Sequence, residues 1–372
     1  MKKASIFFLI LSISFISSAQ KDTKTEDKEK SNIKKVLIPT ISYNNSFKTS
    51  IGVMAAGFYA LSANDTISPI SSTTFIASYS TNDTWVAILP NKFYFNEDRF
   101  RSKLVVGTGS VNFQTYQVWG ALLGGVPNEI LPPQFIPQGD GVFIDYQNRF
   151  YFLFTDFMVN IYDRLYAGVN IVYSGSKTTF DVPTTPSDTQ NLFGFGLASE
   201  FDTRNNQMQP LTGFNGKLNT TSFLENLGST SNYTNINLQY NRYFKQGERN
   251  TIALRFYAQA AVGDVPFAAQ NVVGRDDLRG YSNGKYRANQ VYDVQTEYRH
   301  WFREKWGYVA FGGVATAINN ANDISLNKTL PAVGAGIRFL AVPKARISVG
   351  VDVAAGKDDW GVYFRIGEAF GR

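Results

Sequence analysis

The sequence contains no cysteine, which excludes a disulfide framework, a zinc–thiolate site and thiol chemistry. After residue 16 it also lacks any apolar run long enough to cross a membrane as a helix. Helical periodicity is almost absent, and neither a phosphate-cradling glycine loop nor a metal-ligand cluster is present, so no cofactor is expected. The fold must therefore gain its stability from elements other than helices, disulfides or metals.

Concentrated positive charge is lacking as well. The formal net charge is +6, but Lys2 and Lys3 belong to the N-terminal segment and residues 21–35 contribute +2, which leaves +2 for residues 36–372. No basic patch with interleaved aromatic residues stands out in that long remainder. The sequence therefore predicts no nucleic-acid partner.

The N-terminal segment has the features of an export signal. Lys2 and Lys3 precede the apolar stretch Ile6–Ile16, and small residues follow up to Ala19, so we interpret residues 1–19 as a signal peptide rather than an N-terminal anchor. Residues 20–35 are polar and charged, which predicts a flexible leader. The expected organisation is completed by a single β-domain over residues 36–372.

Alternation at period two dominates that domain. In the segment 292–299, apolar and small residues alternate with Asp293, Gln295, Glu297 and Arg299. A soluble sandwich also alternates, but strands of about ten residues with aromatic ends and charged opposite faces are typical of an outer-membrane barrel with a hydrated interior. Because lipid offers no hydrogen bonds, such a sheet must close on itself.

Counting these segments predicts an all-β, 16-stranded antiparallel transmembrane β-barrel. The expected strands start near Val36, Lys48, Ser72, Trp85, Phe100, Val142, Leu165, Leu192, Phe214, Tyr233, Thr251, Val291, Gly307, Ala332, Ala345 and Trp360. Several connections after odd-numbered strands are long, as in 114–141, 175–190 and 263–290, whereas those after even-numbered strands are mostly short. Long external and short periplasmic connections are the rule for such barrels. On the last strand one parity, which should face lipid, holds Trp360, Val362, Phe364, Ile366 and Phe370, and Arg365 should face the lumen.

A tripeptide marks the sixth long connection. Arg279, Gly280 and Tyr281 close the run 276–281 between the eleventh and twelfth expected strands, and Glu297 follows on the twelfth strand with lumen-facing parity. An arginine inside a lumen needs a carboxylate, because an unpaired guanidinium away from bulk water is costly. Glu297 is the first candidate, with Asp293 or Asp352 as a second acid. The alternative is a solvated Arg279 on an external loop.

A second motif, Asp202, Thr203 and Arg204 with Gly213 after it, precedes another strand. Together with the tripeptide, the following glutamate and the aromatic residue near the C-terminus, it resembles the BamA/TamA-type outer-membrane family. In that family an Arg-Gly-Phe/Tyr loop folds back into the barrel and pairs with acidic residues of the inner wall. The resemblance runs over roughly residues 36–370 and is strongest after Ser199.

Two departures accompany the resemblance. Family members that assemble or secrete proteins carry POTRA modules before the barrel, and the leader here is too short for one, so we expect a POTRA-less member. The family's second acidic residue on the thirteenth strand is replaced by Gly312 and Gly313.

The resemblance implies a non-enzymatic barrel in the cell outer membrane that takes part in protein assembly, insertion or secretion. Its partners would be outer-membrane lipids, client outer-membrane proteins and a separate periplasmic or lipoprotein partner. A passive channel constricted by the Arg279 loop is the main alternative, and a barrel lipase is a distant third. The single histidine, His300, has outward parity and is expected in the aromatic girdle rather than in a catalytic pair.

Overall fold

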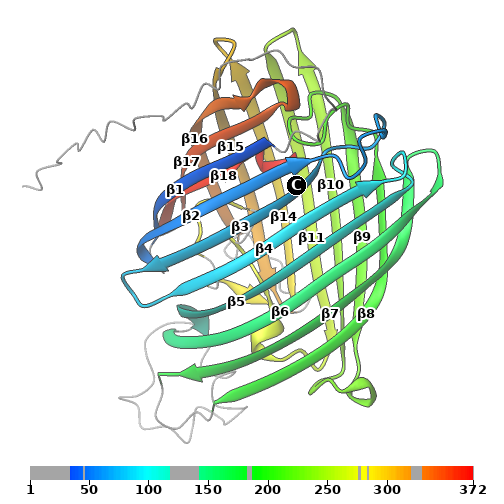
Figure 1. Ribbon diagram of the computed structural model, residues 1–372. Coiled ribbons are helices and arrows are strands. Elements are labelled where there is room, and N and C mark those ends of the chain that lie inside the picture. Colours follow the sequence, from blue (N-terminus) through cyan, green and yellow to red (C-terminus); the bar gives the residue numbers. More distant parts are fainter. Residues whose placement is uncertain are drawn as a thin grey trace, which may run out of the picture. The chain divides into compact units, whose positions relative to one another are not determined.

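The computed structural model describes residues 34–44, 47–117, 142–181, 187–274, 278–282, 285–319 and 329–371. The signal-peptide prediction and the leader up to residue 33 lie outside these ranges. Sixteen strands of the described part close into one antiparallel barrel, and β12 and β13 form a separate two-stranded sheet (Figure 1). The predicted fold class is confirmed.

The strands run in chain order around the barrel. Their bounds are β1 (Lys34–Asn44), β2 (Lys48–Tyr59), β3 (Ser71–Ser80), β4 (Trp85–Phe95), β5 (Phe100–Gln117), β6 (Val142–Tyr162), β7 (Leu165–Phe180), β8 (Asp188–Asp202), β9 (Gly213–Phe223), β10 (Tyr233–Gln246), β11 (Asn250–Gly263), β12 (Asn271–Val272), β13 (Arg287–Ala288), β14 (Gln290–Trp301), β15 (Trp306–Ile318), β16 (Thr329–Val342), β17 (Ile347–Gly356) and β18 (Asp359–Ile366).

The remaining regular elements are short 3-10 turns. They are η3 (Glu225–Leu227), η4 (Phe267–Ala269), η7 (Pro343–Ala345) and η8 (Ala369–Gly371). Within the described ranges, no helix is both long and apolar enough to cross a membrane.

Every barrel strand begins within four residues of the start expected from alternation. The largest difference in length concerns β7, which continues to Phe180 although the long connection was expected from Gly175 onward. The segment Ser174–Thr179 carries small and polar residues on both faces, so it shows no apolar alternation. Pairing with β6 and β8 keeps it extended all the same.

Burial alternates as the parity argument requires. On β14 the side chain of Glu297 is 0% exposed, whereas Val294 on the other face is 54% exposed. The exposed large apolar residues of the strands lie on the outside of the barrel, and the buried charged residues of the strands lie inside it. The packed core of this protein is therefore the barrel interior, and it is largely polar.

The ladder that closes the barrel is the shortest one in it. Strand β1 pairs with β2 along its whole length, from Lys34 to Asn44, but it pairs with β18 only through Tyr43↔Val362 and Asn44↔Gly361. The rings of Tyr43 and Trp360 stack there at 4.6 Å. We call this short junction the seam; Figure 1 shows β1 and β18 next to each other, at the two ends of the colour scale.

Apolar packing takes over where the seam ladder stops. The cluster draws on β2, on the start of β17 and on the end of β18; its buried members are Met54, Ala56, Phe58, Ala345, Ile347 and Ile366. Such contacts hold the two strand groups together without fixing a hydrogen-bond register.

Candidate functional site

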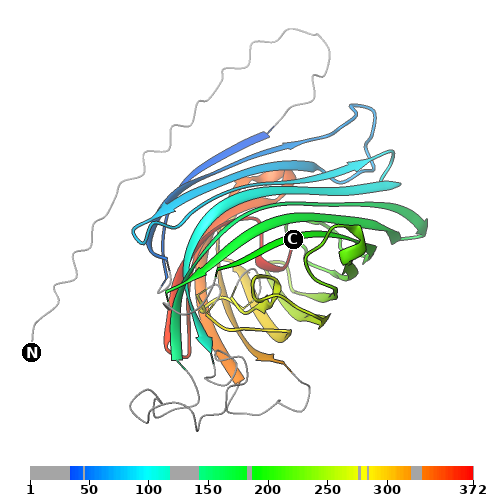
Figure 2. The ribbon, with the colours of Figure 1, turned by 90° about the horizontal axis from the view of Figure 1, so that it is seen from below.

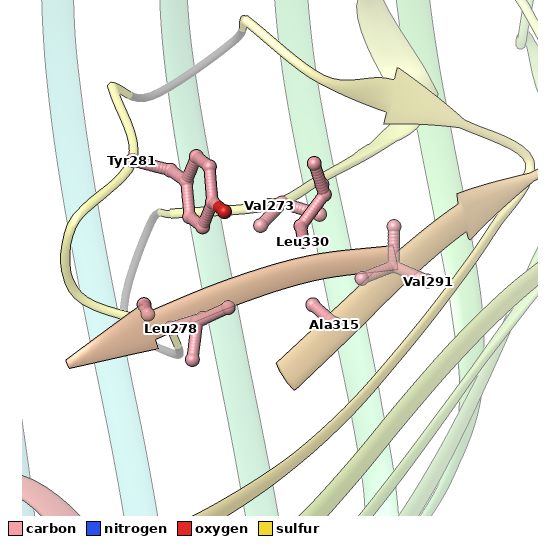
Figure 3. Packing of buried hydrophobic residues seen from close by; sticks show 7 residues of the cluster. Val273, Leu278, Tyr281, Val291, Ala315 and Leu330 are labelled. Carbon is pink, nitrogen blue, oxygen red and sulfur yellow. The ribbon is translucent and has the colours of Figure 1, made fainter. Parts of the chain in front are cut away.

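The connection between β11 and β14 folds into the barrel (Figure 2). Its described tip, Leu278–Ser282, is buried: Leu278 is 2%, Arg279 5% and Tyr281 1% exposed. Asp276 and Asp277, which begin the sequence motif, lie outside the described residues. The tip packs on Val273, Val291, Ala315, Leu330 and Ala332 (Figure 3). Apolar contacts with β14, β15 and β16 therefore hold the loop inside.

Arg279 lies between two carboxylates. Its Nη2 donates to Glu297 Oε2 on β14 at 2.6 Å, and its Nη1 donates to Asp352 Oδ2 on β17 at 2.6 Å. The guanidinium lies over the ring of Phe311 on β15, with Cζ 3.3 Å from the ring centroid. Both distances are those of charge-assisted hydrogen bonds, so one side chain of the loop bridges two strands of the wall.

Gly280 and Tyr281 fix the loop directly after Arg279. Gly280 has a φ of +111°, and a Cβ there would come within 2.9 Å of the Ala355 backbone, so only glycine fits without a shift. Its N–H donates to Tyr363 Oη at 2.9 Å. The Tyr281 hydroxyl donates to the Pro331 carbonyl at 2.6 Å. The tripeptide thus contributes one charge bridge, one close backbone contact and one anchoring hydroxyl.

Further arginines complete an interior cluster around the same two acids. Arg299 Nε donates to Glu297 Oε1 at 2.8 Å, and Arg365 Nε donates to Asp352 Oδ2 at 2.8 Å. Arg338 on β16 also pairs with Asp352. We call this group, with Glu368, the arginine cluster; its members are Arg279, Glu297, Arg299, Arg338, Asp352, Arg365 and Glu368.

Sequence reasoning found only part of this cluster. Asp293, proposed as an alternative second acid, accepts a hydrogen bond from Gln295 Nε2 at 2.8 Å. Asp352 takes that role. On β15, where the family's second acid is missing, Phe311 supplies a ring face and Gly313 leaves room for Leu278. Arg299 and Arg338 were missed, although lumen-facing parity was a usable signal for both.

The second motif holds a turn together. Arg204 Nε and Nη2 donate to Asp202 at 2.8 Å each, and Arg101 on β5 reaches Asp202 and Glu200 at 3.2 Å. The Thr203 N–H donates to the Phe214 carbonyl, and the Phe214 N–H donates to Thr203 Oγ1, at 2.9 Å each. Gly213, the first residue of β9, has a φ of +92°, which the turn into the strand needs.

The C-terminus differs from the expectation. Trp360 is 43% exposed on the outside, and Val362 and Phe364 share its face, half-buried. Ile366 keeps the same parity but is only 8% exposed, because the seam cluster covers it.

The prediction that Phe370 faces lipid is wrong. Gly367, with a φ of +78°, turns the chain away from the sheet, and Phe370 ends inside the barrel at 1% exposure. Its carbonyl accepts hydrogen bonds from Tyr243 Oη and from Asn241 Nδ2. Strand parity does not extend past a residue with positive φ, and this is why the expectation failed.

Glu368 enters the arginine cluster through the same turn. It is 1% exposed, and its Oε2 accepts from Arg338 Nε at 3.1 Å while its Oε1 accepts from Ser348 Oγ at 2.9 Å. Glu368 and Phe370 are therefore both part of the interior.

His300 lies at the end of β14 beside the turn to β15. Its Nδ1 is 2.5 Å from Asn250 Oδ1, and its ring lies 5.1 Å from that of Tyr308. This is an aromatic environment at a strand end, where the sequence analysis expected it.

A closed barrel with an apolar outer wall and a charged interior is a transmembrane barrel of the outer membrane. The Omp85 superfamily domain matches residues 92–370, so the chain belongs to the Omp85 superfamily. The resemblance to the BamA/TamA type is thereby confirmed at the level of the family. No curated protein sequence matches the chain.

Solved structures show the same fold. BamA from Haemophilus ducreyi lacking POTRA domains 1–3 superposes with a TM-score of 0.56 at 12% identity, over 91% of this chain and 71% of that one. CdiB from Acinetobacter baumannii gives a TM-score of 0.57 at 13% identity, over 89% and 59%. CdiB from Escherichia coli gives 0.54 at 10%, over 88% and 62%. The chain thus spans less than two thirds of either CdiB chain.

Proposed function

We propose that this barrel takes part, without enzymatic activity, in the assembly, insertion or secretion of outer-membrane proteins. The observation that carries the proposal is the seam. Only two residue pairs join β1 to β18, although β1 pairs with β2 through all eleven of its residues. The sheet is therefore weakest at the junction of its first and last strands.

A short seam leaves strand edges without partners in the ladder. On the side facing β18, residues 34–42 of β1 have no register partner, and on the side facing β1 the same holds for residues 363–366 of β18. Unpaired strand edges are templates for a further strand. In a bilayer the pressure to pair is strong, because no water satisfies the backbone groups. A client strand that added at the seam would satisfy both edges.

The two sides of the seam are held to different degrees. On the C-terminal side, Arg279 ties β14 to β17, and Arg365 of β18 is bound to the same Asp352. On the N-terminal side, β1 is held by its ladder with β2 and by apolar packing. This favours a mechanism in which β1 and β2 move while β18 stays with the arginine cluster. Clients, and a separate periplasmic or lipoprotein partner, would approach the moving side.

The test locks the seam with a disulfide. Tyr43 and Val362 are register partners, and paired strands bring Cα atoms to about 4.5–5.5 Å, within the range of a disulfide. The sequence has no cysteine, so Tyr43→Cys with Val362→Cys gives one defined bond. In proteoliposomes, we expect the oxidised variant to stop accelerating the folding of an added unfolded barrel protein, and reduction to restore it.

The matched control is Ile41→Cys with Ile51→Cys, which joins β1 to β2 at another outward register pair. Oxidation of this control should leave the acceleration intact. If the seam disulfide has no effect while purified protein conducts ions in planar bilayers, the channel reading replaces the assembly proposal.

A further inference from the structure

On the outer wall from β4 to β8, apolar, aromatic and charged side chains lie in separate rows. Its outward residues form rows across the strands because the registers are continuous. One row is entirely apolar or aromatic from β4 to β8, namely Leu89, Val106, Leu153, Tyr173 and Phe193. Toward the even-strand turns the wall ends in a ring stack of Phe95, Phe100 and Phe157. These rows are the surface that lipid tails would cover.

Toward the long loops the outward residues change from apolar to polar and cationic within two rows. Tyr151 marks the first, with its ring 5.9 Å from that of Tyr173. The next row contains Trp85, Ser110, Arg149, Lys177 and Thr189. From Arg149 to Val159, which lies in the Phe100 row, β6 advances ten residues, or roughly 33 Å along the strand. With a tilt of about 40° this becomes roughly 25 Å of height, the thickness of an apolar band. The Arg149 row therefore lies at the level of lipid headgroups.

Arg149 and Lys177 are direct register partners on adjacent strands, and both are exposed. Like charges placed directly opposite each other across a ladder destabilise it. Among the described residues neither has an ion-pair partner, and Arg149 Nε donates only to Gln147 Oε1, at 3.1 Å. A cation pair in this position would gain from an anion that bridges it.

The acids nearby do not supply that anion. Asp145 lies four residues from Arg149 on β6, roughly 13 Å along the strand, and Asp181 lies beyond Lys177 at the same end. Asp83 lines the same groove and accepts a hydrogen bond from Tyr79 Oη at 2.6 Å, but in the described part of the chain no ion pair joins it to Arg149 or Lys177.

The wall is hollowed at this place. A groove of about 690 Å³ is lined by Arg149 and Lys177 together with Trp85, Tyr151 and Gly175. Gly175 is the register partner of Tyr151, whose ring occupies the space that a Cβ at position 175 would need. The groove thus has two cations in the row of Trp85, and the ring of Tyr151 lies on its apolar side. A lipid headgroup above its acyl chains would match this arrangement.

We propose that Arg149 and Lys177 bind the phosphate-bearing headgroup of an anionic lipid in the leaflet on the long-loop side, with its chains on the apolar rows below. The bridging phosphate removes the like-charge repulsion and gains two charge-assisted hydrogen bonds. Tyr151 and Trp85 flank it as interfacial aromatic residues. This inference is independent of the proposed function of the seam.

The experiment compares lipid adducts on the full chain by native mass spectrometry. Purified protein in detergent is titrated with phosphatidylglycerol and, separately, with phosphatidylcholine. We expect the wild type to bind the anionic lipid on the order of tenfold more tightly, and Arg149→Gln with Lys177→Gln to lose that preference. A heat-modifiable folded band for each variant shows that the barrel is intact.

The charge-matched control is Arg99→Gln with Arg242→Gln. Both residues lie near the opposite ends of their strands, beside Phe100 and Phe244. This control should keep the lipid preference. The proposal is overturned if Arg149→Gln with Lys177→Gln retains the preference or if the control loses it equally. Binding of inorganic phosphate alone, with affinity equal to that for the lipid, would make the site one for soluble anions and would also overturn it.

Discussion

The seam and the wall around β5 and β6 close the same sheet in opposite ways. All eighteen residues of β5 have register partners on β6, whereas β1 has two on β18. Since each unsatisfied backbone group in hydrocarbon costs several kcal/mol, the wall has no low-cost way to open. The seam has one. The β5–β6 junction is thus strong and the β1–β18 junction is weak. The difference lies in the number of paired residues rather than in residue type.

The largest effect is expected from a charge on the lipid face. Phe195 on β8 is 47% exposed near the middle of the wall, and Phe364 faces outward beside the seam. An arginine at either place should cost about 2–4 kcal/mol. We expect Phe364→Arg to lose more of the heat-modifiable folded band than Phe195→Arg. The reason is that β8 is held by a long ladder, whereas β18 has only two residue pairs with β1.

The control for this pair is Asn191→Arg, which places the same charge on the outward face of β8 in the Tyr151 row, opposite Gly175 rather than opposite a cation. Its folded yield should stay close to that of the wild type. Equal yields for Phe364→Arg and Phe195→Arg would remove the distinction between seam and wall.

Breaking the arginine cluster should have the next largest effect. Arg279→Ala leaves the buried Glu297 and Asp352 without one cation each, at a cost of about 1–3 kcal/mol because both acids keep other arginine partners. Thermal unfolding in detergent measures the loss. In a double-mutant cycle, adding Glu297→Gln should recover part of it. Additive losses for the two substitutions would mean that the ion pair contributes nothing to stability.

A smaller effect is expected at the seam itself. Trp360→Ala removes the ring stack on Tyr43, which is worth about 0.5–1.5 kcal/mol. Amide hydrogen exchange should already be faster in β1 than in β5, and the substitution should accelerate it in β1 alone. Uniform acceleration around the barrel would instead indicate global destabilisation.

The smallest effect concerns the turn between β2 and β3. Hydrogen bonds from the Ser68 hydroxyl, and then from the Ser68 N–H, lower the pKa of Asp65 from 3.8 to about 2. The depressed pKa means that this stabilisation is present above the ordinary value and lost as pH falls toward 2. At a solvent-accessible turn it amounts to less than about 1 kcal/mol. Asp65→Asn should flatten the pH dependence of unfolding in that window; an unchanged profile would contradict it.

The sequence predicts the barrel well because alternation records which side of each strand meets lipid. Parity also placed Arg365 in the lumen and Glu297 opposite the loop. It could not rank Asp293 against Asp352, because both face inward and the choice depends on how far the loop penetrates. Nor could it foresee Ile366 under the seam cluster, since cross-strand cover leaves no local pattern.

Phe370 shows a different limit. A glycine near the end of a strand is compatible with a bulge, a stop or a reversal. The inward path is selected by tertiary contacts, among them the hydrogen bonds of Tyr243 and Asn241 to the Phe370 carbonyl. The seam is invisible to strand patterns for a similar reason, because β1 alternates normally although most of one edge has no register partner.

Glu368 gives the arginine cluster a dependence on the order of folding. Arg338 lies on β16, whereas its partner Glu368 follows β18. The carboxylate can therefore reach the guanidinium only after β17 and β18 have been added beside β16. Until then the buried Arg338 has one of its two counter-charges, Asp352, and lacks the other. Completion of the sheet and neutralisation of its interior are thus one event.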